Sequence, residues 1–123
     1  MLIVRDAFNG KQRFNEFQKS LGAAKNILSS RLKKLVDDGI LKIVHEEDPR
    51  AGHRYLLTAK GEGLYVVLVA LWQWGEQNCF ESGVLDFAMV DKRNGMPLSP
   101  LALESADGRK LSPRDFKTVR LER

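Results

Sequence analysis

The segment RFNEFQKSLGAAKNILSSRLKKLVDDGIL, residues 13–41, constrains the fold more than any other part of the chain. Its first part has apolar side chains at helical spacing, namely Phe14, Phe17 and Leu21. Gly22 is predicted to end this helix, because glycine readily adopts the left-handed conformation common at helix C-termini. A second helix is predicted over residues 25–38, and Gly39 ends it. Two short helices joined by a tight turn are therefore expected.

The second predicted helix has an apolar side and a polar side. The apolar stripe consists of Leu28, Leu32, Leu35 and Val36. At 100° per residue the opposite side carries Asn26, Ser30, Lys33, Lys34 and Asp37, with Ser29 on the flank. The helix is thus expected to pack through leucine and valine and to present basic and small polar groups outward.

Two strand-like runs follow the helices. They cover residues 40–46 and 53–57, and the turn-forming segment EEDPRAG lies between them. This pattern predicts a β-hairpin, and the loop between its strands carries basic residues. These are Arg50, His53 and Arg54.

A further helix is predicted from the N-cap Thr58 to about residue 78, although Gly61 and Gly63 weaken its first turn. In the segment LYVVLVALW, residues 64–72, every residue is apolar or aromatic. A surface helix normally has a polar face. One small domain cannot easily cover such a helix on all sides, which favours a partner subunit over burial within the chain.

The last part of the chain has a different character. VLDFAMVD (84–91) and LSPLALES (98–105) are strand-like, and turn signals follow each of them. We expect residues 81–123 to form a small β-rich extension and residues 1–80 to form the main domain with its helix over 58–78.

Composition excludes several classes of protein. The chain has 123 residues, 43% hydrophobic and 29% charged, which is typical of an ordinary globular domain. No apolar run is long enough to span a membrane, so the cytoplasm is expected. One Cys and two His exclude an internal disulfide and disfavour a zinc site, and no cofactor is expected. The sequence shows no nucleophile–base pair and no phosphate-binding loop, so nothing in it indicates an enzyme.

The positive charge is concentrated in the first half of the chain. The net charge is +4, whereas residues 1–60 hold 12 Lys or Arg against 7 Asp or Glu. Residues 11–34 alone hold 7 basic residues against Glu16. A charge run can simply be a solvated surface, but its concentration on one pair of helices also points to a polyanionic partner.

Helix, tight turn, basic helix and hairpin together predict a winged helix-turn-helix in an α+β, mainly α, fold. An α-helical hairpin packed for stability alone is the competing interpretation. The major groove of DNA, about 12 Å wide, admits one helix, whose polar side chains read base edges while Lys and Arg contact phosphates. Asn26 suits adenine. The predicted DNA contacts are Arg13, Lys25, Asn26, Ser29, Ser30, Lys33, Lys34, Arg50, His53 and Arg54.

Four blocks carry a family resemblance: RFNEFQ (13–18), LSSRLKKLVDDGIL (28–41), DPRAGHRYLLTAKG (48–61) and ALWQWG (70–75). In order and spacing they resemble the HxlR-type winged helix-turn-helix transcription regulators of bacteria and archaea. The resemblance implies a homodimer that binds double-stranded operator DNA without catalysis. It assigns recognition to the helix over 25–38 and the wing to 41–57.

The resemblance also implies that the helix after the wing takes part in dimerisation. The predicted interface residues are Leu64, Val67, Leu68, Leu71, Trp72 and Trp74. The dimer helices and the extension leave room for a small-molecule effector, but no residue identifies a ligand.

Three departures from the family pattern stand out. The family usually begins with a further helix, often preceded by a cysteine, and this sequence starts near the end of that helix. The recognition helix usually opens with Gly-Ile-Ser, whereas here the residues are Gly22-Ala23-Ala24, so the serine N-cap is missing. Cys79 is the remaining candidate for redox sensing, but nearby Glu76 and Glu81 disfavour its thiolate. A structural cysteine is the simpler interpretation.

A second function remains open at this stage. A protein-interaction module could keep the winged-helix fold without binding DNA. In that case the apolar run of residues 64–72 would bind a different protein rather than a second copy of this chain. Retention on DNA, or its absence, distinguishes the two.

Overall fold

The computed structural model describes residues 1–78 and 87–122. The main elements, in chain order, are α1 (Leu2–Phe8), α2 (Phe14–Leu21), α3 (Lys25–Asp37), β1 (Leu41–His45), β2 (His53–Leu57), α4 (Ala59–Glu62) and α5 (Tyr65–Asn78). The chain divides into two compact units, Met1–Leu68 and Val69–Arg123, and the division falls inside α5. The division predicted at residue 80 lies outside the described residues.

The helix–turn–helix forms as predicted, and α3 ends one residue before its expected end. Gly22 has φ 65°, in the left-handed region where glycine is favoured. At the start of α2 the Glu16 carboxylate accepts hydrogen bonds from the backbone N–H groups of Gln12 and Arg13, at 3.2 and 3.0 Å. These bonds favour the charged form and lower the pKa of Glu16. Its side chain thus anchors the loop that leads into α2.

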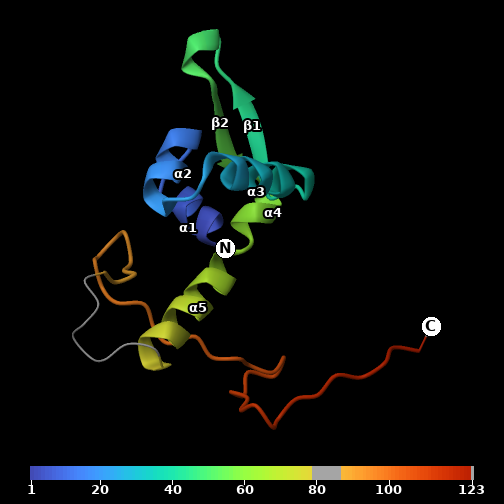
Figure 1. Cartoon of the computed structure of the whole chain (residues 1–123). Helices are drawn as coiled ribbons and strands as arrows, with labels where there is room; N and C mark the ends of the chain where they lie inside the picture. Colours follow the sequence, from blue (N-terminus) through green and yellow to red (C-terminus); the bar gives the residue numbers. More distant parts are fainter. Residues whose placement is uncertain (79–86, 123) are drawn as a thin grey trace. The chain divides into compact units, whose positions relative to one another are not determined.

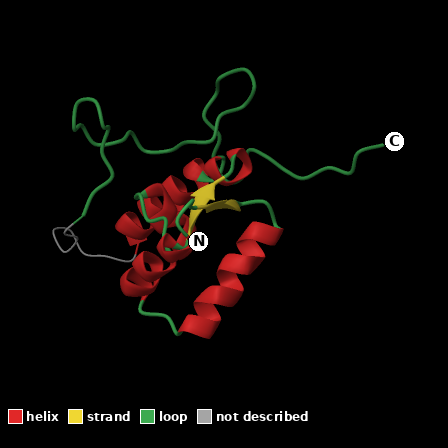
Figure 2. Ribbon diagram, turned by 90° about the horizontal axis from the view of Figure 1, so that it is seen from above, coloured by secondary structure: helices red, strands yellow, loops and turns green. Residues whose placement is uncertain are grey.

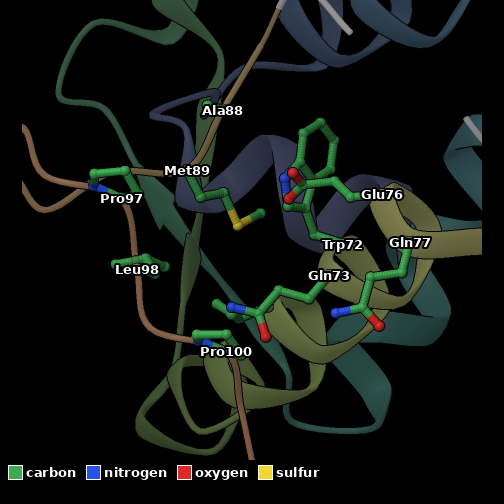
Figure 3. A pocket seen from close by; sticks show the side chains of 10 residues that line it. Trp72, Gln73, Glu76, Gln77, Ala88, Met89, Pro97, Leu98 and Pro100 are labelled. Atoms are coloured by element: carbon green, nitrogen blue, oxygen red, sulfur yellow. The ribbon is translucent and has the colours of Figure 1, made fainter. Parts of the chain in front are cut away.

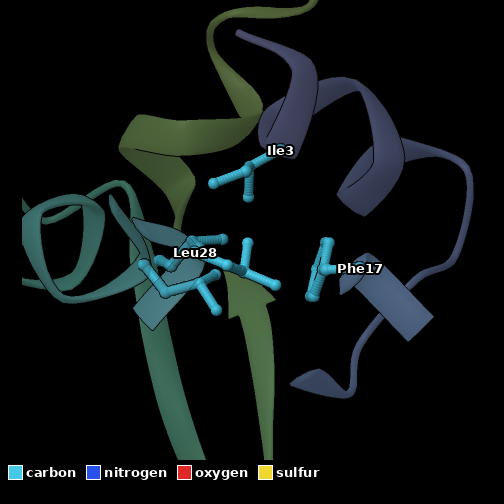
Figure 4. Packing of buried hydrophobic residues seen from close by; sticks show 5 residues of the cluster. Ile3, Phe17 and Leu28 are labelled. Atoms are coloured by element: carbon cyan, nitrogen blue, oxygen red, sulfur yellow. The ribbon is translucent and has the colours of Figure 1, made fainter. Parts of the chain in front are cut away.

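A compact apolar core joins the helices of the first unit to the hairpin. Its buried members are Ile3, Phe17, Leu28, Leu32 and Leu41. Figure 4 shows Ile3 of α1, Phe17 of α2 and Leu28 of α3 meeting in one space. Phe17, Leu28 and Leu32 are 0% exposed, which confirms the apolar faces predicted for α2 and α3. The apolar face of α3 therefore packs against this core, and its opposite face is exposed to solvent.

The hairpin pairs in a single antiparallel register, from Leu41 opposite Leu57 to His45 opposite His53. A short 3-10 helix, Pro49–Ala51, forms the tip. Figure 1 shows the hairpin extending away from α1, α2 and α3. The backbone N–H of Tyr55 donates to the carbonyl oxygen of Gln12 at 2.7 Å, which ties the free edge of β2 to the loop before α2. We call residues 41–57 the wing.

The single helix expected over residues 58–78 is divided in two. Thr58 caps α4 as predicted, since its hydroxyl oxygen accepts from the N–H of Gly61 at 3.0 Å. α4 ends at Glu62 with Gly63 as its C-cap, and α5 begins at Tyr65. The Thr58 N–H donates to the carbonyl oxygen of Ile40 at 3.0 Å, and Lys60 Nζ donates to that of Asp38 at 2.7 Å. α4 is thus fastened to the turn after α3.

The described part of the C-terminal extension contains no continuous strand. Figure 2 shows residues 87–122 as loop. Their β structure consists of two isolated antiparallel bridges, Val90 to Pro97 and Glu104 to Lys110. Proline has no N–H to continue a ladder; Pro100 lies within the second expected strand and Pro97 immediately before it. The described parts of the two predicted strands, residues 87–91 and 98–105, do not form continuous strands. Residues 84–86 of the first prediction lie outside the described residues.

Candidate nucleic-acid interface

The outer face of α3 is open to solvent along its whole length. All six side chains that the sequence assigned to DNA on this helix are exposed. They are Lys25, Asn26, Ser29, Ser30, Lys33 and Lys34. Lys34 Nζ lies 3.6 Å from Asp38 Oδ2, but both side chains are more than half exposed. Such a pair contributes little and can exchange for another anion.

The N-terminal end of α3 lacks a side-chain cap. Its N-cap is Ala24, whose methyl group cannot accept from the first N–H groups. The family pattern has a serine at this position, and Ala24 replaces it in this chain. Unpaired N–H groups and the helix dipole favour an anion at this end, and Lys25 adds a positive charge beside it.

Two of the predicted DNA contacts meet at a single carboxylate between α2 and the wing. Arg13 Nη2 lies 3.0 Å from Glu46 Oε1, and Arg54 Nε lies 2.8 Å from the same oxygen. Arg54 Nη1 also donates to Gln12 Oε1 at 3.3 Å. The Arg54 Nε–H is not aimed at the oxygen, so this contact is mainly a charge attraction. We call Arg13, Glu46 and Arg54 the arginine–glutamate cluster.

Sequence reasoning did not single out Glu46 or Gln12. A signal for Glu46 was available in the hairpin itself. Val44 of β1 pairs with Arg54, and Glu46 follows two residues later, immediately after the end of β1. Diagonal neighbours of this kind are within reach of long side chains. Gln12 had no comparable signal, because its contacts depend on how the loop before α2 approaches β2.

At the wing, Arg50 and His53 have different surroundings. The Arg50 side chain is 95% exposed at the tip, 4.0 Å from Asp48. The exposed His53 shares a hydrogen bond of 3.0 Å with the Tyr55 hydroxyl. Tyr55 in turn packs edge-on against buried Phe17, and partial burial raises the pKa of the Tyr55 hydroxyl. His53 is therefore held on the body of the wing, whereas Arg50 is displayed.

The HxlR-like helix-turn-helix family matches residues 1–82. The chain belongs to this family. This confirms the resemblance drawn from the four sequence blocks, and the α+β winged-helix fold agrees with it. The family match ends before the described part of the extension begins.

The chain is similar both to curated proteins and to solved structures. The uncharacterized HTH-type transcriptional regulator Rv3095 of Mycobacterium tuberculosis is 40% identical over 78 residues, 63% of this chain and 49% of Rv3095. This chain therefore spans about half the length of the mycobacterial relatives. Among solved structures, the candidate transcription factor PA1607 is 44% identical with a TM-score of 0.90, covering 98% of this chain and 84% of PA1607. The likeness to PA1607 thus includes the extension.

A second solved structure, the candidate transcription factor PA1374 of Pseudomonas aeruginosa, is 34% identical with a TM-score of 0.70. The similarity covers 98% of this chain and 82% of PA1374.

Within residues 1–78 and 87–122, no helix has both the length and the apolar character needed to cross a membrane.

The six residues assigned to a dimer interface, Leu64 just before α5 and the other five on it, fall into two groups. Val67, Leu71 and Trp74 are 46%, 53% and 60% exposed. Leu64, Leu68 and Trp72 are half-buried. Cys79, the candidate redox residue, lies outside the described residues. The first three residues therefore remain the strongest candidates for contact with another chain.

Replacing Glu46 with glutamine is expected to release Arg13 and Arg54 from their shared counter-ion. The protein should lose about 1 kcal/mol of unfolding free energy, because the cluster is only partly buried. Affinity for any DNA duplex should rise about threefold, since the two arginines lose the carboxylate that competes with phosphate for their charge. Among the described residues, Glu47 forms no such contact with either arginine. Urea unfolding and fluorescence anisotropy check the two effects. The control is Glu47→Gln, an exposed neighbour; equal effects of both changes would contradict the role of the cluster.

Proposed function

We propose that this chain is a sequence-specific, non-enzymatic transcriptional regulator that binds double-stranded operator DNA as a homodimer. In the proposed complex α3 enters the major groove and the wing approaches the adjacent minor groove. The observation that carries the proposal is the outer face of α3, where basic and small polar side chains are exposed on a helix whose other face is buried. Family membership supports the same conclusion.

Along α3 the proposed roles follow the size and charge of each side chain. Asn26, Ser29 and Ser30 lie in the N-terminal half and are short, so the helix can approach base edges closely there. An Asn amide can pair with both the N6 and N7 positions of adenine. The longer Lys25, Lys33 and Lys34 are suited to phosphates on either side of the groove. The uncapped start of α3 offers further N–H donors to a phosphate.

The wing contributes less positive charge than its sequence suggests. Glu46 offsets one of the two charges of Arg13 and Arg54, and the three side chains are 27–38% exposed. Arg50 is the wing residue best placed to reach the minor groove or its phosphates, because it extends from the tip. We therefore propose that Arg50 makes the main contact of the wing, while Arg13 and Arg54 chiefly hold the wing against α2.

Dimerisation is proposed through the exposed side of α5. Val67, Leu71 and Trp74 follow one another at spacings of four and three residues, so they share one face of the helix. Leaving three large apolar side chains about half exposed is unfavourable for a lone chain. In a two-fold symmetric dimer, the same face of α5 in each of the two chains would be covered by the other.

The Leu71→Lys variant is expected to be a monomer. An ammonium group at the centre of an apolar interface loses its hydration without gaining a partner, whereas exposed Leu71 contributes little to the fold of one chain. Analytical ultracentrifugation should show twice the chain mass for the parent protein and a single chain mass for the variant. Thr118→Lys adds the same charge to the extension and should remain dimeric. A parent protein of single chain mass would refute the dimer.

DNA binding is tested by fluorescence anisotropy of the purified protein with a duplex from its own upstream region and a scrambled duplex. We expect tighter binding to the upstream duplex at both of two salt concentrations. The affinity should fall steeply with salt, since each neutralised phosphate contributes nearly one unit to the log–log slope. Equal binding to both duplexes would refute sequence-specific recognition. Absence of binding to either, from a dimeric protein, would favour the interaction-module alternative.

A further inference from the structure

The second compact unit contains a cavity between α5 and the extension. Its volume is about 200 Å³. Figure 3 shows Trp72 and Glu76 of α5 on one side and Met89, Pro97, Leu98 and Pro100 of the extension on the other. A volume of this size accommodates a molecule with a single aromatic ring. The family match ends at residue 82, so the wall formed by the extension lies outside it.

The far wall of the cavity is fastened to α5 by one side chain. Gln73 Nε2 donates to the carbonyl oxygen of Ser99 at 3.1 Å, and Gln73 Oε1 accepts from the N–H of Leu101 at 2.7 Å. Both polar ends of the amide are thus used to hold the backbone on either side of Pro100. The cavity is therefore a built feature of this unit, since a specific pair of hydrogen bonds positions its wall.

The indole N–H of Trp72 is the most informative group in the cavity. Its Nε1 atom is buried and has no hydrogen-bond partner in the described structure. A buried donor without a partner is uncommon in folded proteins and costs free energy. In Figure 3 the nitrogen edge of the ring lies on the side toward Met89. An acceptor atom of a bound molecule would satisfy this donor.

The other groups of the cavity restrict the class of ligand. The proline rings, Met89 and the indole offer apolar and aromatic surface, which suits a flat ring. Glu76 brings a carboxylate and Gln77 an amide to the same cavity. A carboxylate disfavours an anion but accepts a hydrogen bond from an N–H group. A ligand with a carbonyl oxygen and a neighbouring N–H matches both Trp72 and Glu76.

We propose that this cavity binds a small uncharged aromatic amide, with its carbonyl oxygen accepting from Trp72 Nε1 and its N–H donating to Glu76. The site shares no residue with the outer face of α3. It does not depend on the proposed DNA-binding function, and its test involves no DNA.

Benzamide is the probe, and benzoate is the matched control with the same ring and a negative charge. The chain has two tryptophans, so Trp74→Phe leaves Trp72 as the sole tryptophan fluorophore. We expect benzamide to change the fluorescence of this variant in a saturable way, with at least tenfold weaker binding of benzoate. Equal affinity for both compounds, or a change that does not saturate, would overturn the proposal.

Trp72→Phe then tests the unpaired donor, because it keeps an aromatic ring and removes the N–H. Ligand-observed NMR should show benzamide binding about five- to tenfold more weakly, as expected for the loss of one hydrogen bond. Glu76→Gln keeps an acceptor oxygen, so benzoate should gain relative to benzamide. Circular dichroism establishes that both variants are folded. Unchanged benzamide affinity in folded Trp72→Phe would rule out the proposed contact.

Discussion

The Gly61→Ala variant is expected to lose about 3 kcal/mol of its free energy of unfolding, at the upper end of the usual cost of overpacking. A Cβ atom at this position would lie 2.2 Å from the carbonyl oxygen of Ile40 and 3.0 Å from a Leu57 methyl group. The first contact is with backbone, which cannot rotate away as a long side chain can. Either α4 must shift or the turn after α3 must deform.

Both adjustments would break hydrogen bonds at the same junction. The N–H of Thr58 donates to Ile40, and the Thr58 hydroxyl donates to the carbonyl oxygen of Gly39 and caps Gly61. Urea unfolding followed by circular dichroism measures the loss. Gly63→Ala is the control, since its Cβ would lie 3.3 Å from the nearest oxygen and its φ is −61°. We expect a change within about 1 kcal/mol there. Similar losses at both glycines would show that helix propensity, rather than the close approach at Ile40, sets the effect.

The Asn26→Ala variant is expected to lose most of the preference for its operator over a scrambled duplex. One bidentate contact between an amide and adenine contributes about 1–3 kcal/mol to discrimination, so the ratio of the two affinities should fall about tenfold or more. Stability should hardly change, because Asn26 is exposed on the outer face of α3. Anisotropy with both duplexes at one salt concentration gives the ratio directly.

Lys33→Ala should behave differently, although it lies on the same face of α3 two turns later. A phosphate contact carries no base information, so binding to both duplexes should weaken by the same factor. The log–log salt slope should fall by about one unit. Asn15→Ala, an exposed change on α2, is the control for both variants. An unchanged operator preference in Asn26→Ala would show that α3 does not read bases through this residue.

α2, α3 and the wing could be predicted because local patterns determine them, whereas the break between α4 and α5 was not predicted. Apolar spacing located the buried faces of α2 and α3, Gly22 marked the end of α2, and Thr58 marked the start of α4. The extension could not be predicted in the same way. Its apolar residues form short strand-like runs, but a strand requires a partner with available N–H groups, and the prolines interrupt that pairing.

The candidate interface divides along the same line. Exposure of Asn26 and Lys33 follows from the period of one helix and could be predicted. In the arginine–glutamate cluster, Glu46 lies 33 positions after Arg13 and 8 positions before Arg54. The cluster therefore depends on how the wing packs against α2. The unpaired indole of Trp72 likewise depends on the path of the extension past α5, which no local pattern specifies.

By itself the sequence determined the positions of α2 and α3, which face of α3 is buried and where the positive charge is concentrated, because these properties depend on neighbouring residues. Only the tertiary structure decided the role of Gly61. In the sequence this glycine weakens a helix, whereas in the fold it allows α4 to approach the backbone of Ile40. The tertiary structure also decided that Arg13 and Arg54 share Glu46, while Arg50 lies at the tip with its side chain 95% exposed beside Asp48, since charge pairing is set by distance in space.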